Sequence, residues 1–154
     1  PCGYASDPER ACVCAPGQIL KYRKRISGPL LDRIDLHIEV PRLKFDKLNS
    51  AELSESSENI RGRIIPARER QHARFKGTKI STNAEMTAKE IKDICLLDSQ
   101  TQELIRNAVE QLRLSGRGYH RILKVARTIA DLANEEDIAL SHVAEALQYR
   151  AKVE

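Results

Sequence analysis

Residues 116–133 read GRGYHRILKVARTIADLA, and the fold follows largely from this segment. Its apolar residues recur at helical spacing, which places on one face Ile122, Leu123, Ala126, Ile129, Ala130 and Ala133. A helix with one apolar face must bury that face against other elements. We therefore predict an amphipathic helix here, separated from the preceding helix by the glycines at its start.

The sequence around this helix predicts three more helices. Thr87 and Glu90 form a capping box that opens a short helix, and residues 99–102 read as a second box that opens a longer one. Ser141 is the predicted cap of the last helix. The side chains expected to face inward are Leu104, Ile105, Ala108, Val109 and Leu112, then Val143, Ala144 and Leu147. Short connections between such helices favour an antiparallel bundle.

Residues 34–40 follow a different period. Apolar and polar side chains alternate, as Ile34, Leu36, Ile38 and Val40 against Asp35, His37 and Glu39. This alternation predicts a strand at the edge of a sheet, with one face exposed to solvent. Pro41 ends the predicted strand. The expected fold class is therefore mainly α, with one edge strand.

A basic helix is predicted over residues 59–75, after a helix start at Ser56. Residues 61–79 hold one acid and seven basic residues, namely Arg61, Arg63, Arg68, Arg70, Arg74, Lys76 and Lys79. Pro66 lies inside this helix, where its ring opposes the carbonyl group of Gly62. We expect a kink or break between these two residues.

Composition and charge limit the classes of protein. The 154 residues are 41% hydrophobic but only 4% aromatic, so the core must be aliphatic. Residues 1–79 carry a net charge of +6 and residues 80–154 one of −2, which indicates a polyanionic partner or a solvated charged surface. There is no apolar run near the ~20 residues needed to span a bilayer. With no visible signal peptide, we expect a cytoplasmic protein, and the initial Pro1 indicates processing or truncation.

Three of the four cysteines lie within the first fourteen residues, at Cys2, Cys12 and Cys14. Thiolates beside Gly and Pro turns can converge on a tetrahedral zinc ion. A closed site needs four ligands, so the fourth would lie before residue 1. A disulfide between two of these cysteines and free thiols remain alternatives. Cys95, in an apolar stretch, is expected to be a small buried hydrophobic residue.

Known catalytic motifs are missing from the chain, including the phosphate loop G-x-x-x-x-G-K-S/T. What remains are arginines at the starts of predicted elements. Arg33 stands where the predicted strand begins, and Arg117 and Arg121 flank the start of an apolar helix, where anions bind favourably. For each of them a surface ion pair is the alternative.

The segment SGPLLDRIDLHIEVP at 27–41 resembles the hallmark segment of the magnesium-chelatase-like AAA+ ATPases, the bacterial ComM group. Three further stretches resemble the family in the same order: PCGY at 1–4 with Cys12-x-Cys14, ARERQ at 67–71 with Arg74-Phe75, and GYHRILKVARTIADL at 118–132. The resemblance spans essentially the whole chain. It implies the C-terminal part of a longer protein, whose phosphate loop, magnesium-binding acid and sensor-1 strand precede residue 1. A Cys-Pro pair before Cys2 would supply the missing thiolate.

The resemblance also implies roles. Arg33 matches the arginine finger, and Arg121 matches the sensor-2 arginine, with Arg117 as a nearby alternative. Residues 1–79 would form the end of the AAA+ core, with strand 34–40 at the edge of its parallel sheet, and residues 80–154 would form the helical lid. Pro66 departs from the family pattern.

The implied function is ATP hydrolysis with Mg²⁺ in a ring, expected to be a hexamer, coupled to DNA remodelling. The expected DNA contacts are Arg61, Arg63, Arg68, Arg70, Arg74 and Lys76. The fragment alone is not expected to be active. A chelatase subunit for magnesium insertion and a non-enzymatic zinc-knuckle module that binds nucleic acid are the alternatives.

Overall fold

The computed structural model of the protein describes residues 1–5, 7–40 and 54–150. They fall into two compact units. The first includes Pro1–Ile34 and residues 38–40, and the second includes Asp35–His37 and residues 54–150. The helices in chain order are α1 (Pro16–Arg23), α2 (Gly28–Leu31), α4 (Ser57–Arg74), the 3₁₀ turn η1 (Asn83–Glu85), α5 (Ala88–Ile94), α6 (Ser99–Gln111), α7 (Gly116–Leu132) and α8 (Leu140–Gln148). The fold is therefore mainly helical, as predicted.

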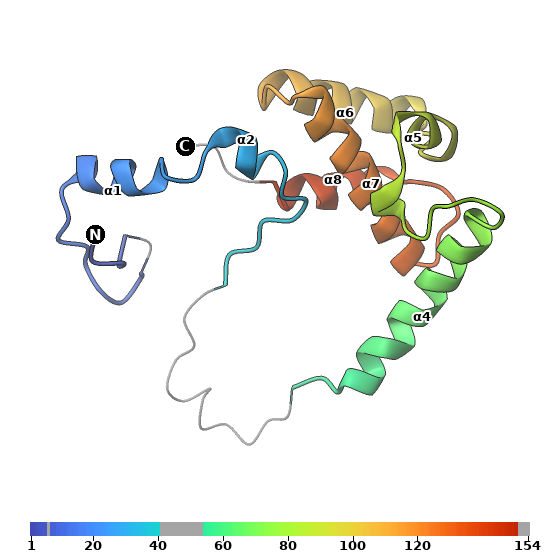
Figure 1. Cartoon of the computed structure of the whole chain (residues 1–154), viewed down its shortest axis with the longest axis horizontal. Coiled ribbons are helices and arrows are strands. Elements are labelled where there is room, and N and C mark those ends of the chain that lie inside the picture. Colours follow the sequence, from blue (N-terminus) through green and yellow to red (C-terminus); the bar gives the residue numbers. More distant parts are fainter. Residues whose placement is uncertain (6, 41–53, 151–154) are drawn as a thin grey trace. The chain divides into compact units, whose positions relative to one another are not determined.

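Helix α7 organises the second unit (Figure 1). It packs against α4, η1, α5 and α8, and α6 packs against α8. The core holds Ile122, Leu123 and Ala126 of α7, with buried side chains from the surrounding elements that include Phe75, Met86, Ile91, Cys95, Ile105, Ile138, Val143 and Ala146. The predicted inward face of α7 and the burial of Cys95 are confirmed, except that Ala133 is exposed.

The helix starts were predicted to within one or two residues. The capping box of α5 is confirmed, because the Thr87 N–H donates to Glu90 Oε2 over 2.8 Å. Helix α6 begins one residue earlier than its predicted box, since the Asp98 carboxylate already accepts the Thr101 N–H at 2.7 Å. Ser141 does not cap α8. It lies inside the first turn, where His142 Nδ1 instead accepts the Ala139 N–H at 3.0 Å.

The predicted edge strand at 34–40 is not formed. These residues belong to no helix or strand, and their apolar side chains Ile34, Leu36, Ile38 and Val40 are all exposed. A strand needs a neighbour to share its ladder of hydrogen bonds. The described ranges contain no other strand to act as that neighbour. Instead the His37 N–H donates to the Tyr149 carbonyl at the end of α8, over 2.8 Å.

A kink or break was predicted between Gly62 and Pro66, and the break is not formed, because α4 runs from Ser57 to Arg74 without interruption (Figure 1). Ser56 caps it by accepting the Asn59 N–H at 3.2 Å. Pro66 removes only one hydrogen bond of the helix, and it does so opposite an exposed Gly62 whose carbonyl group water can reach. Helices α1 and α2, by contrast, were not predicted. Neither buries a side chain, so no apolar period marks them.

Candidate functional site

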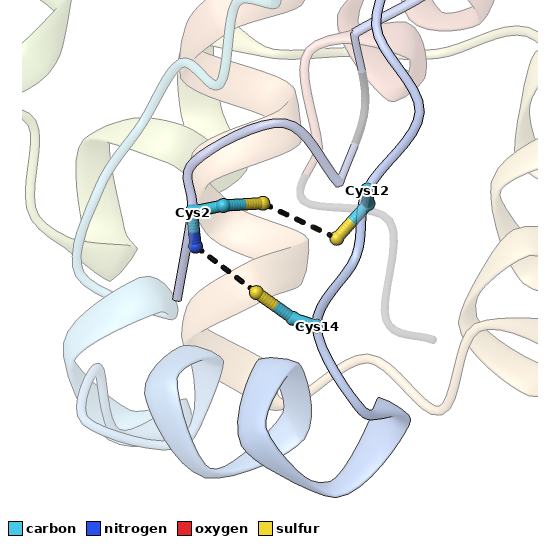
Figure 2. A group of neighbouring side chains, drawn as sticks. All are labelled: Cys2, Cys12 and Cys14. Atoms are coloured by element: carbon cyan, nitrogen blue, oxygen red, sulfur yellow. Dashed lines mark hydrogen bonds between the residues drawn. The ribbon is translucent and has the colours of Figure 1, made fainter.

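The three N-terminal cysteines converge in the structure (Figure 2). Their sulfur atoms all lie within 4.8 Å of one another, and Cys2 Sγ is 3.5 Å from Cys12 Sγ. The Cys2 N–H donates to Cys14 Sγ over 3.0 Å. Gly3 has a φ of +87°, a conformation that other residues rarely adopt, and so lets the chain turn directly after Cys2.

The environment of the Cys2 sulfur favours its thiolate form. A hydrogen bond from the Tyr4 backbone N–H is the main cause that lowers the pKa of Cys2 to about 7. The neighbouring Tyr4 ring is covered by the Arg10 guanidinium, whose carbon lies 4.1 Å from the ring centroid. Cys95 behaves in the opposite way, since burial raises the pKa of its thiol to about 11. The backbone N–H of Cys14 lowers the pKa of Cys12, but the hydrogen bond and charge of Cys2 and burial outweigh it, so that pKa is raised. It is the convergence of three sulfurs that makes the cluster chemically suited to bind a soft metal ion.

Arg33 is exposed and follows the short helix α2. Its Nη1 donates to the Pro29 carbonyl over 2.8 Å, and the Ser27 hydroxyl accepts the Leu30 N–H at the start of α2. The exposed guanidinium is therefore bonded to the turn that carries it.

The two α7 arginines differ in their surroundings. Arg117 is exposed in the first turn of α7, which the Ser115 hydroxyl caps by accepting the Gly118 N–H at 3.0 Å. Arg121 lies one turn later and is mostly covered, with Nε 3.0 Å from Asp35 Oδ1. The structure therefore places both on one helix, with Arg121 already engaged by a carboxylate.

The six basic residues predicted to contact DNA have very different environments. Arg61 and Lys76 are exposed, and Arg63 pairs with Glu55, Nη2 to Oε2, over 2.8 Å. The other three point back toward the protein, where Arg68 donates to Gln71 at 2.8 Å, Arg70 to the Asn134 carbonyl at 3.1 Å, and Arg74 to Asp131 at 2.9 Å.

A buried polar network joins α4, η1 and α7, and the sequence analysis missed it. Asp131 is fully buried, and besides Arg74 it accepts from Asn83 Nδ2 over 2.7 Å and pairs with Arg127 Nε at 3.2 Å. Arg127 also donates to the Glu135 carbonyl over 2.8 Å. The available indication was that Arg127 and Asp131 stand four residues apart, inside the apolar face of α7.

Burial by itself would raise the pKa of Asp131. The hydrogen bonds from Arg74 and Asn83 and the charges of Arg74 and Arg127 outweigh burial, so the pKa lies below its usual value. The carboxylate therefore stays ionised inside the unit and acts as the common acceptor that fixes α4 against α7.

Two protein families match this chain, one over its N-terminal part and one over its C-terminal part. Residues 54–150 match the family described as magnesium chelatase, subunit ChlI C-terminal, and residues 1–48 match magnesium chelatase, subunit ChlI. The chain is 46% identical over 140 residues, 90% of its length, to the competence protein ComM of Haemophilus influenzae. It is 40% identical over 139 residues, again 90% of its length, to the uncharacterized protein YifB of Salmonella typhimurium.

The fold and the matches define a helical module preceded by a cysteine-bearing segment. The chain belongs to the magnesium chelatase family, in its ComM-like branch. It spans only 27% of the length of each of these two relatives. Among the described residues, no helix combines the length and the apolar character that crossing a membrane requires.

Proposed function

We propose that this chain is the C-terminal part of an AAA+ ATPase that hydrolyses ATP with Mg²⁺ in a ring of subunits and remodels DNA. The observation that carries the proposal is the family match over both 1–48 and 54–150. The chain has no phosphate loop, so its own residues serve the nucleotide through arginines rather than through a triphosphate cradle. ATP and Mg²⁺ would be held mainly by the part of the protein that precedes residue 1.

Arg33 is the proposed arginine finger. Its guanidinium is exposed, and in this role it would stabilise the negative charge that develops on the γ-phosphoryl group of a nucleotide bound by a neighbouring subunit. Arginine suits this task because its planar fork binds two oxygens at once and stays charged at every working pH.

Arg117 and Arg121 are the proposed sensor-2 candidates on α7. The ion pair with Asp35 engages Arg121, whereas Arg117 is exposed in the first turn. The environments therefore favour Arg117 for direct phosphate contact. Arg121 would first exchange its Asp35 partner, which makes it the better candidate for a residue that responds to nucleotide.

The lid in this proposal is the bundle of α5 to α8. The domain boundary expected after residue 79 stays a prediction. Helix α4, which precedes that boundary, packs against α7 of the lid, and the Arg74–Asp131 ion pair joins the two helices. DNA contact is proposed chiefly for the exposed basic residues of the 61–79 segment, since Arg70 and Arg74 already bind groups of the bundle.

The chelatase alternative has one supporting observation, which is the family description itself. It differs from the first proposal in the partner and not in the nucleotide chemistry. DNA-stimulated ATP hydrolysis by the complete protein would favour remodelling, whereas hydrolysis unaffected by DNA would favour the alternative.

The test of the proposal is Arg33→Ala in the complete protein, with Lys24→Ala as an exposed control of equal charge change. Turnover should fall by about 10³–10⁵ while nucleotide affinity changes little, because a finger contacts the transition state more than the bound substrate. Arg33→Lys should rescue poorly.

Mixing experiments then test whether the residue acts between subunits. An Arg33→Ala subunit combined with a phosphate-loop variant should regain partial activity, since each supplies what the other lacks across an interface. Full activity of Arg33→Ala alone would overturn the finger assignment.

A further inference from the structure

We propose that Cys2, Cys12 and Cys14 bind one Zn²⁺ ion through three thiolates. The bound ion would be the main interaction that stabilises the fold of the N-terminal segment. The fourth coordination position is left to a ligand outside this set. The inference does not depend on nucleotide chemistry, because it rests on the sulfur geometry of the first unit alone.

The sulfur positions suit a tetrahedral ion. Two thiolates that each lie about 2.3 Å from a tetrahedral zinc are about 3.8 Å apart. Cys2 and Cys12 have their sulfurs 3.5 Å apart, and the set including Cys14 lies within 4.8 Å (Figure 2). Small side-chain rotations would bring all three to bonding distance, so the loop is nearly preorganised for the metal.

Backbone N–H groups already point at these sulfurs. The Cys2 N–H donates to Cys14 Sγ at 3.0 Å, those of Tyr4 and Val13 donate to Cys2, and that of Cys14 donates to Cys12. Hydrogen bonds of this kind orient metal ligands and offset part of their negative charge. Four backbone amides that donate to three sulfurs are not expected in a segment whose cysteines are unrelated to one another.

The N-terminal segment also has little else to stabilise it. Of the described residues up to 40, none is buried, and neither α1 nor α2 contributes a side chain to a core. A short segment without a core commonly depends on a metal or a disulfide. A disulfide would use two of the three sulfurs and leave the third, whereas one zinc ion engages all of them. The thiols are not linked in the structure.

The test is metal titration of the reduced 154-residue chain. Co²⁺ should bind at one equivalent with a sulfur-to-cobalt charge-transfer absorption, and Zn²⁺ should displace it. Cys2→Ser, Cys12→Ser and Cys14→Ser should each weaken binding at least about tenfold, whereas Cys95→Ala, the matched control in the helical unit, should not. Absence of the absorption in the reduced chain, or an unchanged metal affinity in any of the three serine variants, overturns the proposal.

A second measurement needs no variant. Alkylation followed by mass spectrometry should show that Zn²⁺ protects Cys2, Cys12 and Cys14, while the labelling of buried Cys95 is unchanged by the metal. Equal labelling of the three with and without zinc overturns the site. Neither readout involves ATP, so failure here is distinct from failure of the proposed ATPase role.

Discussion

Asp131 shows how one residue can set the geometry of the helical unit. Its side chain is inaccessible to solvent and accepts from Arg74 and Asn83 while pairing with Arg127. Two arginines around one buried carboxylate are stable only while that carboxylate is charged. The residue therefore links the position of α4 to the ionisation of a single group.

Asp131→Asn should destabilise the chain by about 3–5 kcal/mol at neutral pH, because it leaves buried arginine charge without its partner. The pKa of Asp131 is depressed in the folded state, so its stabilising effect is present above the unfolded pKa of about 4 and lost as pH falls through the folded pKa. Denaturant unfolding monitored by circular dichroism at several pH values measures this.

The difference between the unmodified chain and Asp131→Asn should be greatest above about pH 4 and shrink in acid. Asp137→Asn, an exposed aspartate in the loop before α8, is the control and should change stability little. A constant difference across the pH range would contradict the assigned role of the carboxylate.

At the scale of the element, α4 has two different surfaces. Ala67 and Gln71 are buried against the bundle, while the first turns of the helix are exposed. Three of its arginines are occupied by hydrogen bonds to Gln71, Asn134 and Asp131. Its basic sequence therefore overstates the charge that is available to a polyanion.

Binding of duplex DNA to the chain should be weak and should fall as salt increases. The double variant Arg61→Ala with Lys76→Ala should weaken it and reduce the slope of log affinity against log salt by about 2, roughly one unit for each phosphate that is no longer neutralised. Lys89→Ala with Lys92→Ala makes the same charge change at exposed positions of α5 and should have little effect. Fluorescence anisotropy at two salt concentrations measures both, and equal weakening in the two double variants would indicate nonspecific charge attraction.

At the scale of the whole molecule, the described residues of the N-terminal unit bury no side chain, whereas the helical unit has a packed core. Residues 35–37 belong to the helical unit by their contacts, through the Arg121–Asp35 pair and the His37–Tyr149 hydrogen bond. The proposed finger Arg33 thus lies two residues before a segment that is anchored to α7 and α8.

The isolated 154-residue chain should neither hydrolyse ATP nor bind it tightly, because no phosphate loop is present. Steady-state phosphate release should equal that of a protein-free blank, with the complete protein as the positive control. Release that disappears in an Arg33→Ala version of the isolated chain would contradict this expectation.

The helices of the bundle, the inward face of α7 and the family could all be predicted from the amino-acid sequence. Periodicity and capping are local properties, so the helices within 87–148 could be predicted without coordinates, although the predicted Ser141 cap and the predicted burial of Leu112 and Ala133 were wrong. The cysteine spacing likewise predicted the thiol cluster, although not its N–H···S contacts.

The partners of the charged residues and the state of residues 34–40 depended on tertiary packing. An alternating pattern specifies a strand only when a neighbouring strand accepts its hydrogen bonds, and the described residues provide none. In the same way, the charge on Arg74 is visible in the sequence, but its burial against Asp131, 57 residues away, depends on how α4 packs against α7. Long-range contacts of this kind follow from packing rather than from local pattern, which is why the basic helix could be predicted and its available charge could not.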